Sequence, residues 1–403
     1  MINRLLCTII AKNYVAFART LSRSFLARYS DGKVYVLIVD DFEGYINPAE
    51  ECFAIVRLGE LEIPKLPEFC FKYSVKELCT AAKPSFLEYL VCEKHCQSLI
   101  YLDPDVLITG SLDGLYDNLG KHDIILTPHL DTDYPEDDRL PDEGHILRAG
   151  QFNLGFIGIN SSANACAFLS WWKSKLREHC VVDVPNGYFV DQRIVDFVPI
   201  LFGRVLIEKN TGYNVAYWNL HSRQLSLANG NWQCNDVPLG FFHFSGYDPS
   251  SSSISSHIPN YRARFRLVNG SDLRNLFAIY KKLLLANGHA QATSWPYTFD
   301  YFKNGERVPN YLRTYYRRLP AAKRAAAPFE CPELEELARA GSPMIEEAEL
   351  TEAAELEAIR NSPAWRWVFR YGRFKDRFLQ PIYNLLRRPV KKKMGKNPDY
   401  DRE

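Results

Sequence analysis

Short apolar runs alternate with amphipathic stretches through the first half of the chain. Helices are predicted at 14–29 and 82–95, where apolar residues recur with the helical period. The apolar runs predict buried strands at 4–11, 33–41, 53–58, 98–108 and 122–129. Strands that alternate with helices favour an α/β fold with a mostly parallel sheet, and in such sheets ligands bind beyond the carboxyl ends of the strands.

The second half of the chain mixes helix-like and strand-like patterns. Helices are predicted at 163–180, at 271–288 behind a serine N-cap and, as a short one, at 189–199. The predicted strands are 151–160, 205–209, 214–220 and 239–246. Beyond about 320, an acidic stretch rich in Ala and Leu precedes a basic, aromatic tail. We therefore expect one domain at 1–320 and a helical C-terminal extension at 321–403.

Composition limits the classes of function. The 403 residues are 46% hydrophobic and 24% charged, as in a folded protein with a large core, and the net charge of +1 gives no overall attraction to nucleic acid. Ten cysteines without a CxxC pair are typical of a reduced, cytosolic protein. No signal-peptide pattern and no apolar run of ~20 residues is present, so a cytoplasmic protein is expected.

The tail at 361–403 adds a possible partner. Trp, Phe and Tyr lie among its Lys and Arg residues, a composition typical of helices that lie on an anionic membrane surface. A packing helix with solvated charges, or a disordered end, has the same composition. The first interpretation predicts peripheral contact with the inner face of the cell membrane.

Two carboxylates, Asp103 and Asp105, interrupt the apolar run at 98–108, with Pro104 between them. Like charges this close repel each other and are costly to bury, so something must compensate them. A divalent cation is one answer, because Mn²⁺ and Mg²⁺ take one or two carboxylates together with substrate phosphates. An ordinary surface turn at a strand end is the alternative.

Several segments resemble, in order, the retaining family-8 type of GT-A glycosyltransferases, which includes glycogenin and bacterial lipooligosaccharide galactosyltransferases. They are IIAKNYVAFARTLSRSF, AKPSFLEYL, the DPD turn, FNLGFIGIN, VDQRIVD and FFHFSG, within roughly residues 4–250. The combination with YNVAYWNL is similar to bacterial surface-polysaccharide transferases. This resemblance implies a GT-A fold with a Rossmann-like, mixed sheet. It also implies transfer of a sugar from a nucleotide-diphosphate sugar, UDP-sugar favoured, to a glycan or lipid-linked acceptor with retention.

The resemblance also implies roles for matching residues. Asp103, Asp105 and His243 would hold Mn²⁺ or Mg²⁺, and the ion would bridge the donor diphosphate. Asp191 and Gln192 would lie near the transferred sugar. The implied contacts to the donor are Ala11, Lys12, Asn13, Lys83, Asp103, Pro104, Asn153 and Gly246. Each position also has a structural explanation, such as a core histidine, a solvated lysine, a strand bulge or an aspartate at a helix N-terminus.

One expected residue is missing. The family usually follows its His-x-x-Gly segment with a lysine that contacts the leaving diphosphate, whereas HFSGYDPSSSSIS contains none. Arg223, His221 or the serines of 250–256 could take that role. Arg223 is therefore predicted as a catalytic residue.

Two other classes of function remain open at this point. A haloacid-dehalogenase-like phosphatase would also carry a DxD motif, but it has Thr or Val where Leu107 stands and places the motif on its first strand. A non-catalytic protein that binds sugar nucleotides, or a scaffold that uses its C-terminal helices, would not need the missing lysine.

Overall fold

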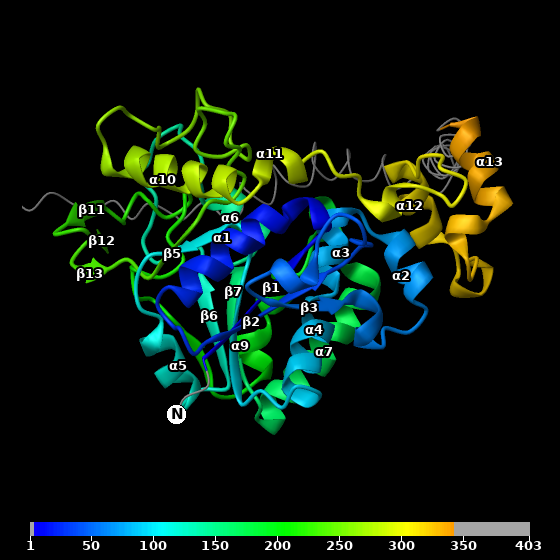
Figure 1. Ribbon diagram of the computed structural model, residues 1–403, viewed down its shortest axis with the longest axis horizontal. Coiled ribbons are helices and arrows are strands. Elements are labelled where there is room, and N and C mark those ends of the chain that lie inside the picture. Colours follow the sequence, from blue (N-terminus) through cyan, green and yellow to red (C-terminus); the bar gives the residue numbers. More distant parts are fainter. Residues whose placement is uncertain (1–3, 342–403) are drawn as a thin grey trace, which may run out of the picture. The chain divides into compact units, whose positions relative to one another are not determined.

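The computed structural model describes residues 4–341 (Figure 1). The predictions for 342–403, including membrane contact through 361–403, lie outside the described residues. The described chain forms a compact unit that runs to Ala338. The domain division at 320 stays a prediction.

A seven-stranded sheet lies at the centre, in the order β10-β6-β7-β4-β1-β2-β3. Its strands are β1 Leu5–Ile10, β2 Lys33–Ile38, β3 Ala54–Arg57, β4 Ser98–Leu102, β6 Ile124–Pro128, β7 Phe152–Asn160 and β10 Val205–Ile207. Strand β7 runs antiparallel to both of its neighbours, while the other strands share one direction. The prediction of a mixed, mostly parallel α/β sheet is confirmed.

Helices cover both faces of this sheet (Figure 1). Along β1, Leu5, Cys7 and Ile9 pack into one hydrophobic core, while Leu6 and Ile10 pack into another. This alternation follows from the strand geometry, in which successive side chains point to opposite faces. The first core includes residues of α2 Leu66–Lys72, α3 Val75–Ala81, α4 Lys83–Cys92 and α7 Ala163–His179, and the second includes residues of α1 Val15–Leu26 and α5 Asp113–Leu119.

Helices near the end of the described chain pack against the first core. They are α12 Asn310–Arg318 and α13 Pro332–Ala340. Arg313 of α12 is almost fully buried, and its guanidinium donates hydrogen bonds to the backbone carbonyls of Phe71 and Tyr73, both at 2.9 Å. Because the last carbonyls of a helix lack intrahelical partners, this arginine satisfies the end of α2 and ties α12 to it.

The remaining elements are short or lie at the margins. The helices are α6 Glu143–Ala149, α8 Gln192–Val195, α9 Val198–Leu201, α10 Asp272–Ala286 and α11 His289–Ala292. The strands are β5 Val106–Ile108, β8 Val182–Asp183, β9 Tyr188–Phe189, β11 Leu225–Ala228, β12 Asn231–Cys234, β13 Val237–Pro238 and β14 Phe241–His243. The helices predicted at 163–180 and 271–288 are confirmed as α7 and α10. Each has a serine N-cap, Ser162 and Ser271 respectively.

The strand predicted at 214–220 is wrong. Apart from one isolated bridge at Val215, this segment forms a loop that folds back on itself. Asn214 adopts a positive φ of 53°, which asparagine tolerates better than most residues. The side chain of Asn219 then donates to the Asn214 carbonyl at 2.9 Å and accepts from Ala216 N–H at 2.9 Å. These side-chain bonds replace the partners that a strand would have provided.

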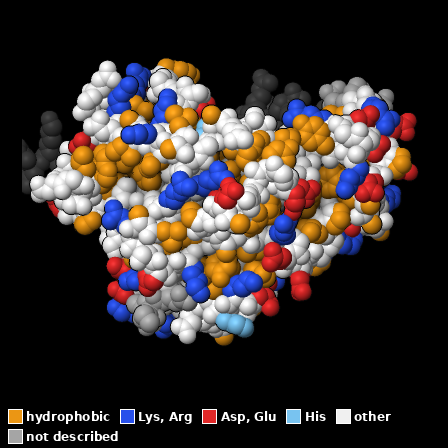
Figure 2. All heavy atoms as spheres, viewed as in Figure 1, with side chains coloured by type: hydrophobic (Ala, Val, Ile, Leu, Met, Phe, Trp, Pro, Cys, Tyr) orange, Lys and Arg blue, Asp and Glu red, His pale blue; other side chains and the backbone are white. Residues whose placement is uncertain are grey.

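Charges on the visible surface are mixed. On the face drawn in Figure 2, Lys and Arg side chains lie among Asp and Glu and do not form one continuous basic area. Within residues 4–341, no helix combines the length and the apolar character that a membrane span requires.

Candidate functional site

The turn Asp103–Pro104–Asp105 lies at the carboxyl edge of the sheet. It connects β4 to β5, so that the apolar run at 98–108 forms two strands broken at Pro104. The backbone N–H of Asp103 donates to the Gly155 carbonyl of β7 at 2.8 Å, and Tyr101 OH donates to Asp103 Oδ1 at 2.6 Å. These bonds fix the first carboxylate while both aspartates stay partly exposed.

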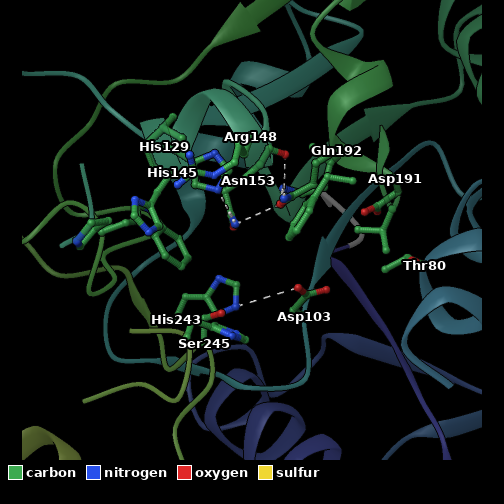
Figure 3. A pocket seen from close by; sticks show the side chains of 18 of the residues that line it. Thr80, Asp103, His129, His145, Arg148, Asn153, Asp191, Gln192, His243 and Ser245 are labelled. Carbon is green, nitrogen blue, oxygen red and sulfur yellow. Dashed lines mark hydrogen bonds and ion pairs between the residues drawn. The ribbon is translucent and has the colours of Figure 1, made fainter. Parts of the chain in front are cut away.

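A two-stranded ribbon brings His243 to this turn. Strand β14 pairs antiparallel with β5, and the register sets His243 opposite Val106. His243 Nε2 consequently lies 3.1 Å from Asp105 Oδ1. It also lies 3.9 Å from Asp103 Oδ2 (Figure 3). One ligand atom from each of the three residues lies within 4.8 Å of the others. Residues that are 138 positions apart in the chain thus form one cluster.

The electrostatics of the cluster favour a cation. Burial alone would lower the pKa of the His243 imidazole, but the Asp105 and Asp103 carboxylates outweigh burial and raise it. Burial would raise the pKa of Asp105, but His243 outweighs that effect and lowers it. Positive charge is therefore stabilised at this point, and a divalent cation would supply it when His243 is neutral.

The donor set fits Mn²⁺ or Mg²⁺. Carboxylate oxygens suit both ions, and an imidazole nitrogen favours Mn²⁺ as the softer of the two. Gly155 makes room for this arrangement, because a Cβ there would lie 2.3 Å from His243 Cε1 and 2.7 Å from Asn153 Oδ1. A side chain at 155 would therefore displace the imidazole from the carboxylates.

Lys83 and Asp191 form a buried ion pair beside the cluster. Lys83 Nζ lies 2.6 Å from Asp191 Oδ2 and 3.8 Å from Asp103 Oδ1, and it also donates to the Leu154 carbonyl at 2.8 Å. Burial would lower the pKa of Lys83, but the carboxylates of Asp191 and Asp103 outweigh it and raise it. The lysine therefore stays charged, and its ammonium lies near both the Asp191 carboxylate and that of Asp103, the first aspartate of the turn.

Asn153 and Gln192 belong to a hydrogen-bonded network next to this pair. Asn153 Nδ2 donates to Gln192 Oε1 at 3.2 Å and lies 3.2 Å from His129 Nε2. Gln192 Oε1 also accepts from the backbone N–H of Leu154 at 3.1 Å. His129 Nδ1 lies 2.8 Å from the Gly150 carbonyl. The sequence had given no role to His129.

His129 makes stability depend on pH in the acidic range. Burial lowers its pKa to about 4 in the folded protein, whereas an unfolded histidine titrates near 6.5. Protons therefore bind the unfolded state first as the pH falls from about 6.5 towards 4, and stability is lost over that window. We expect wild type to lose about 2 kcal/mol more than His129→Gln between pH 7.5 and 5, measured by urea unfolding at both values. Equal losses would show that His129 is not buried as the neutral form.

Two cavities meet at the cluster. The first, cavity I, has a volume of about 350 Å³, and its walls include Lys83, His129, Asn153, Asp191, Gln192 and Trp218 (Figure 3). The second, cavity II, also has a volume of about 350 Å³, and its walls include Ala11, Tyr14, Tyr101, Pro104, Asp105 and Gly246. Both are in the range of small-molecule sites. Asp103 and His243 line both cavities, so the cluster lies where the two cavities adjoin.

Of the residues after the first strand that were predicted to contact the donor, only some line a cavity. Ala11 lines cavity II, whereas Lys12 and Asn13 are not among the lining residues of either cavity. Lys12 is buried, and its ammonium lies 2.7 Å from Asp40 Oδ2. Asn13 Oδ1 is buried without a hydrogen-bond partner. Gly246 has a positive φ of 69° and lines cavity II, where a Cβ would lie 2.6 Å from Ser255 Oγ.

The structure does not bring Arg223 into either cavity. Its guanidinium is buried against Asp131 Oδ2 at 2.9 Å and donates to the Tyr213 carbonyl at 2.7 Å. His221 contacts the Thr132 carbonyl at 2.9 Å. Both residues therefore bond to the segment at 131–132. Neither lines cavity I or cavity II. Sequence reasoning missed the cation that does line both cavities, Lys76 at the start of α3, because a helical lysine carries no local signal.

Comparisons with known proteins give distant matches. The chain matches no protein-family profile. It is 26% identical over 245 residues to the uncharacterized protein YfnD of Bacillus subtilis, covering 60% of this chain and 76% of that one. It is 24% identical over 245 residues to YfnF of the same organism, covering 60% of this chain and 80% of that one.

Among solved structures, the chain is similar to the galactosyltransferase LgtC in complex with donor and acceptor sugar analogs. The TM-score is 0.40 at 16% identity, covering 70% of this chain and 95% of that one. It is also similar to the glycosyltransferase GlyE of Streptococcus pneumoniae, with a TM-score of 0.39 at 16% identity, covering 75% and 67% respectively.

Proposed function

We propose that the protein is a metal-dependent glycosyltransferase that uses a nucleotide-diphosphate sugar, with a UDP-sugar favoured. The observation that carries this proposal is the Asp103, Asp105 and His243 cluster at the junction of two small-molecule cavities. A diphosphate sugar has the matching shape, because its nucleotide and its sugar lie on opposite sides of a metal-binding diphosphate. The segments that resemble GT-A transferases supply part of the lining of both cavities.

In this proposal each cavity binds a different part of the donor. Cavity II, at the end of β1, takes the nucleotide beside Ala11 and Pro104, and cavity I takes the sugar. When bound at the cluster, Mn²⁺ or Mg²⁺ supplies Lewis-acid stabilisation of the negative charge on the leaving diphosphate. Asp191 stabilises positive charge that develops on the sugar. Burial raises the pKa of the Asp191 carboxyl, and the Lys83 ammonium at 2.6 Å opposes that rise and holds the carboxylate in place.

Lys76 takes the role that the missing lysine leaves open. It is exposed and lines both cavities, and its Nζ lies 5.4 Å from the centroid of the Phe189 ring. Its ammonium can therefore reach a diphosphate at the cluster without breaking an ion pair. His257 lines the same two cavities and can donate a hydrogen bond there.

The acceptor enters through the outer wall of cavity I. This wall comes partly from the segment after β6 and includes Pro141, His145 and Arg148. We propose a glycan or lipid-linked glycan as the acceptor, transfer with retention, and a place in bacterial surface-polysaccharide synthesis, on the resemblance to transferases of that type. A cytoplasmic enzyme with peripheral membrane contact through 361–403 would meet such an acceptor at the inner face of the membrane.

The proposal is tested by release of nucleotide diphosphate from a panel of UDP-, dTDP- and GDP-sugars. With Mn²⁺ present, we expect slow hydrolysis of one donor, loss of that activity with EDTA, and a drop of at least 100-fold in Asp105→Asn. The substitution Asp117→Asn, at an exposed position of α5 that lines neither cavity, serves as the matched control and should keep full activity.

Two other results would assign a different function. Phosphate release from simple phosphoesters without any sugar nucleotide would indicate an aspartyl phosphatase. Sugar-nucleotide binding without turnover, also in the presence of acceptor lipid extracts, would indicate a non-catalytic binding protein.

A further inference from the structure

We infer that Asn214 is a positioning residue that fixes the His243 ring with its Nε2 lone pair directed at the two aspartates. This inference rests on the proposed metal-dependent function and adds to it a residue outside the resembling metal motif. Asn214 is 1% exposed and lies in the loop at 214–220, whose positive φ at this residue turns the side chain towards β7 and β14.

The chain of bonds that fixes the ring begins at a backbone group whose role is certain. The N–H of Gly155 can only donate, and it donates to Asn153 Oδ1 at 3.1 Å. This contact sets the orientation of the Asn153 amide, because an NH₂ group at that position would face another donor. The oxygen of Asn153 therefore points towards Asn214.

The orientation of Asn214 follows from the same rule. Its Nδ2 donates to Asn153 Oδ1 at 3.0 Å and to Thr127 Oγ1 at 2.8 Å. Its Oδ1 is then left to face His243 Nδ1, at 3.3 Å. An amide oxygen only accepts, so Nδ1 must carry the proton.

The other end of Asn153 confirms the assignment independently. Its Nδ2 faces Gln192 Oε1, which also accepts from the backbone N–H of Leu154 and is therefore an oxygen. It also faces His129 Nε2, which leaves the His129 Nδ1 proton for the Gly150 carbonyl. Every donor in this chain of amides meets an acceptor, and the direction of each bond is set by a backbone group.

This arrangement prepares His243 for a cation. With the proton held on Nδ1, a neutral His243 presents Nε2 to Asp105 and Asp103. Partners of this kind, which hold the second nitrogen of a ligating histidine, typically contribute 10- to 100-fold to metal affinity. Asn214 acts through His243 and lies outside the lining of both cavities.

The test measures Mn²⁺ affinity of the full-length protein by electron paramagnetic resonance, independently of turnover. Asn214→Gly removes the amide and keeps the positive φ without strain, and we expect its dissociation constant for Mn²⁺ to rise 10-fold or more. Asn214→Asp keeps an acceptor for Nδ1, although its second oxygen then faces the acceptor Asn153 Oδ1, so its affinity should fall less than that of Asn214→Gly. The matched control Thr127→Val removes the other partner of the same amide and should stay within about threefold of wild type, because Gly155 and Asn153 still set the orientation.

The outcomes separate this inference from the proposed function. Equal loss of affinity in all three variants, with a matching fall in melting temperature, would reduce Asn214 to a structural residue and overturn the inference. Wild-type affinity in Asn214→Gly alongside lost affinity in His243→Ala would also overturn it, while the metal site stands. Absence of Mn²⁺ binding by the wild-type protein would overturn the metal-dependent function itself.

Discussion

Replacing Lys83 with methionine should destabilise the protein by about 3–5 kcal/mol, because it leaves the fully buried Asp191 carboxylate without its partner. The double variant Lys83→Met/Asp191→Asn removes both charges and should recover at least half of that loss. Urea unfolding of the two variants and wild type measures these differences. The partly exposed pair of Lys173 and Glu88 is the matched control, and Lys173→Met should change stability by less than about 1 kcal/mol.

Activity separates a structural pair from a functional one. If Lys83 and Asp191 act on the donor as proposed, the double variant should fold well and still lose at least 100-fold in turnover, because the charges near the sugar are gone. A folded double variant with wild-type turnover would show that the pair of Lys83 and Asp191 stabilises the fold and has no part in catalysis.

Gly155→Ala should abolish Mn²⁺ binding while the sheet still folds. The added Cβ would lie 2.3 Å from His243 Cε1 and 2.6 Å from Nδ1, so the imidazole must leave the carboxylates. We expect the Mn²⁺ dissociation constant to rise at least 100-fold, measured by electron paramagnetic resonance.

Gly158 on the same strand provides the control for this substitution. A Cβ at 158 would meet Ile125 Cβ at 3.2 Å, in the core and away from the cluster. Gly158→Ala should cost about 1–3 kcal/mol and leave Mn²⁺ affinity unchanged. A similar loss of affinity in both variants would mean that β7 tolerates no side chain for reasons of packing alone.

The sheet could be predicted because its signals are local. Buried strands of a sheet covered on both faces are continuously apolar, and the runs around β1, β2 and β4 have that character. The turn at Asp103 and Asp105 was visible for the same reason, since two carboxylates and a proline cannot continue such a run.

The loop at 214–220 was mistaken for a strand because its stabilising contacts are not local to the pattern. Alternating apolar residues in NVAYWNL match a strand, but the Asn219 side chain closes the segment on itself. The Asn214 side chain bonds instead to Thr127 and Asn153, which are distant in the sequence. Arg223 lies away from both cavities for a related reason. A basic residue near the site in sequence satisfies a distant carboxylate, Asp131, and this pairing depends on tertiary structure.

Strand β7 is antiparallel to its neighbours, and the geometry of the site depends on the register in which it pairs with β4. Because β7 alone runs against its neighbours, its first residues, and not its last, lie at the edge where β4 ends. A slip of one residue against β4 would put Leu154 or Phe156 where Gly155 faces His243 and would turn Asn153 away from Asn214. Insertions or deletions between β6 and β7 that shift this pairing should therefore silence the site without unfolding the sheet.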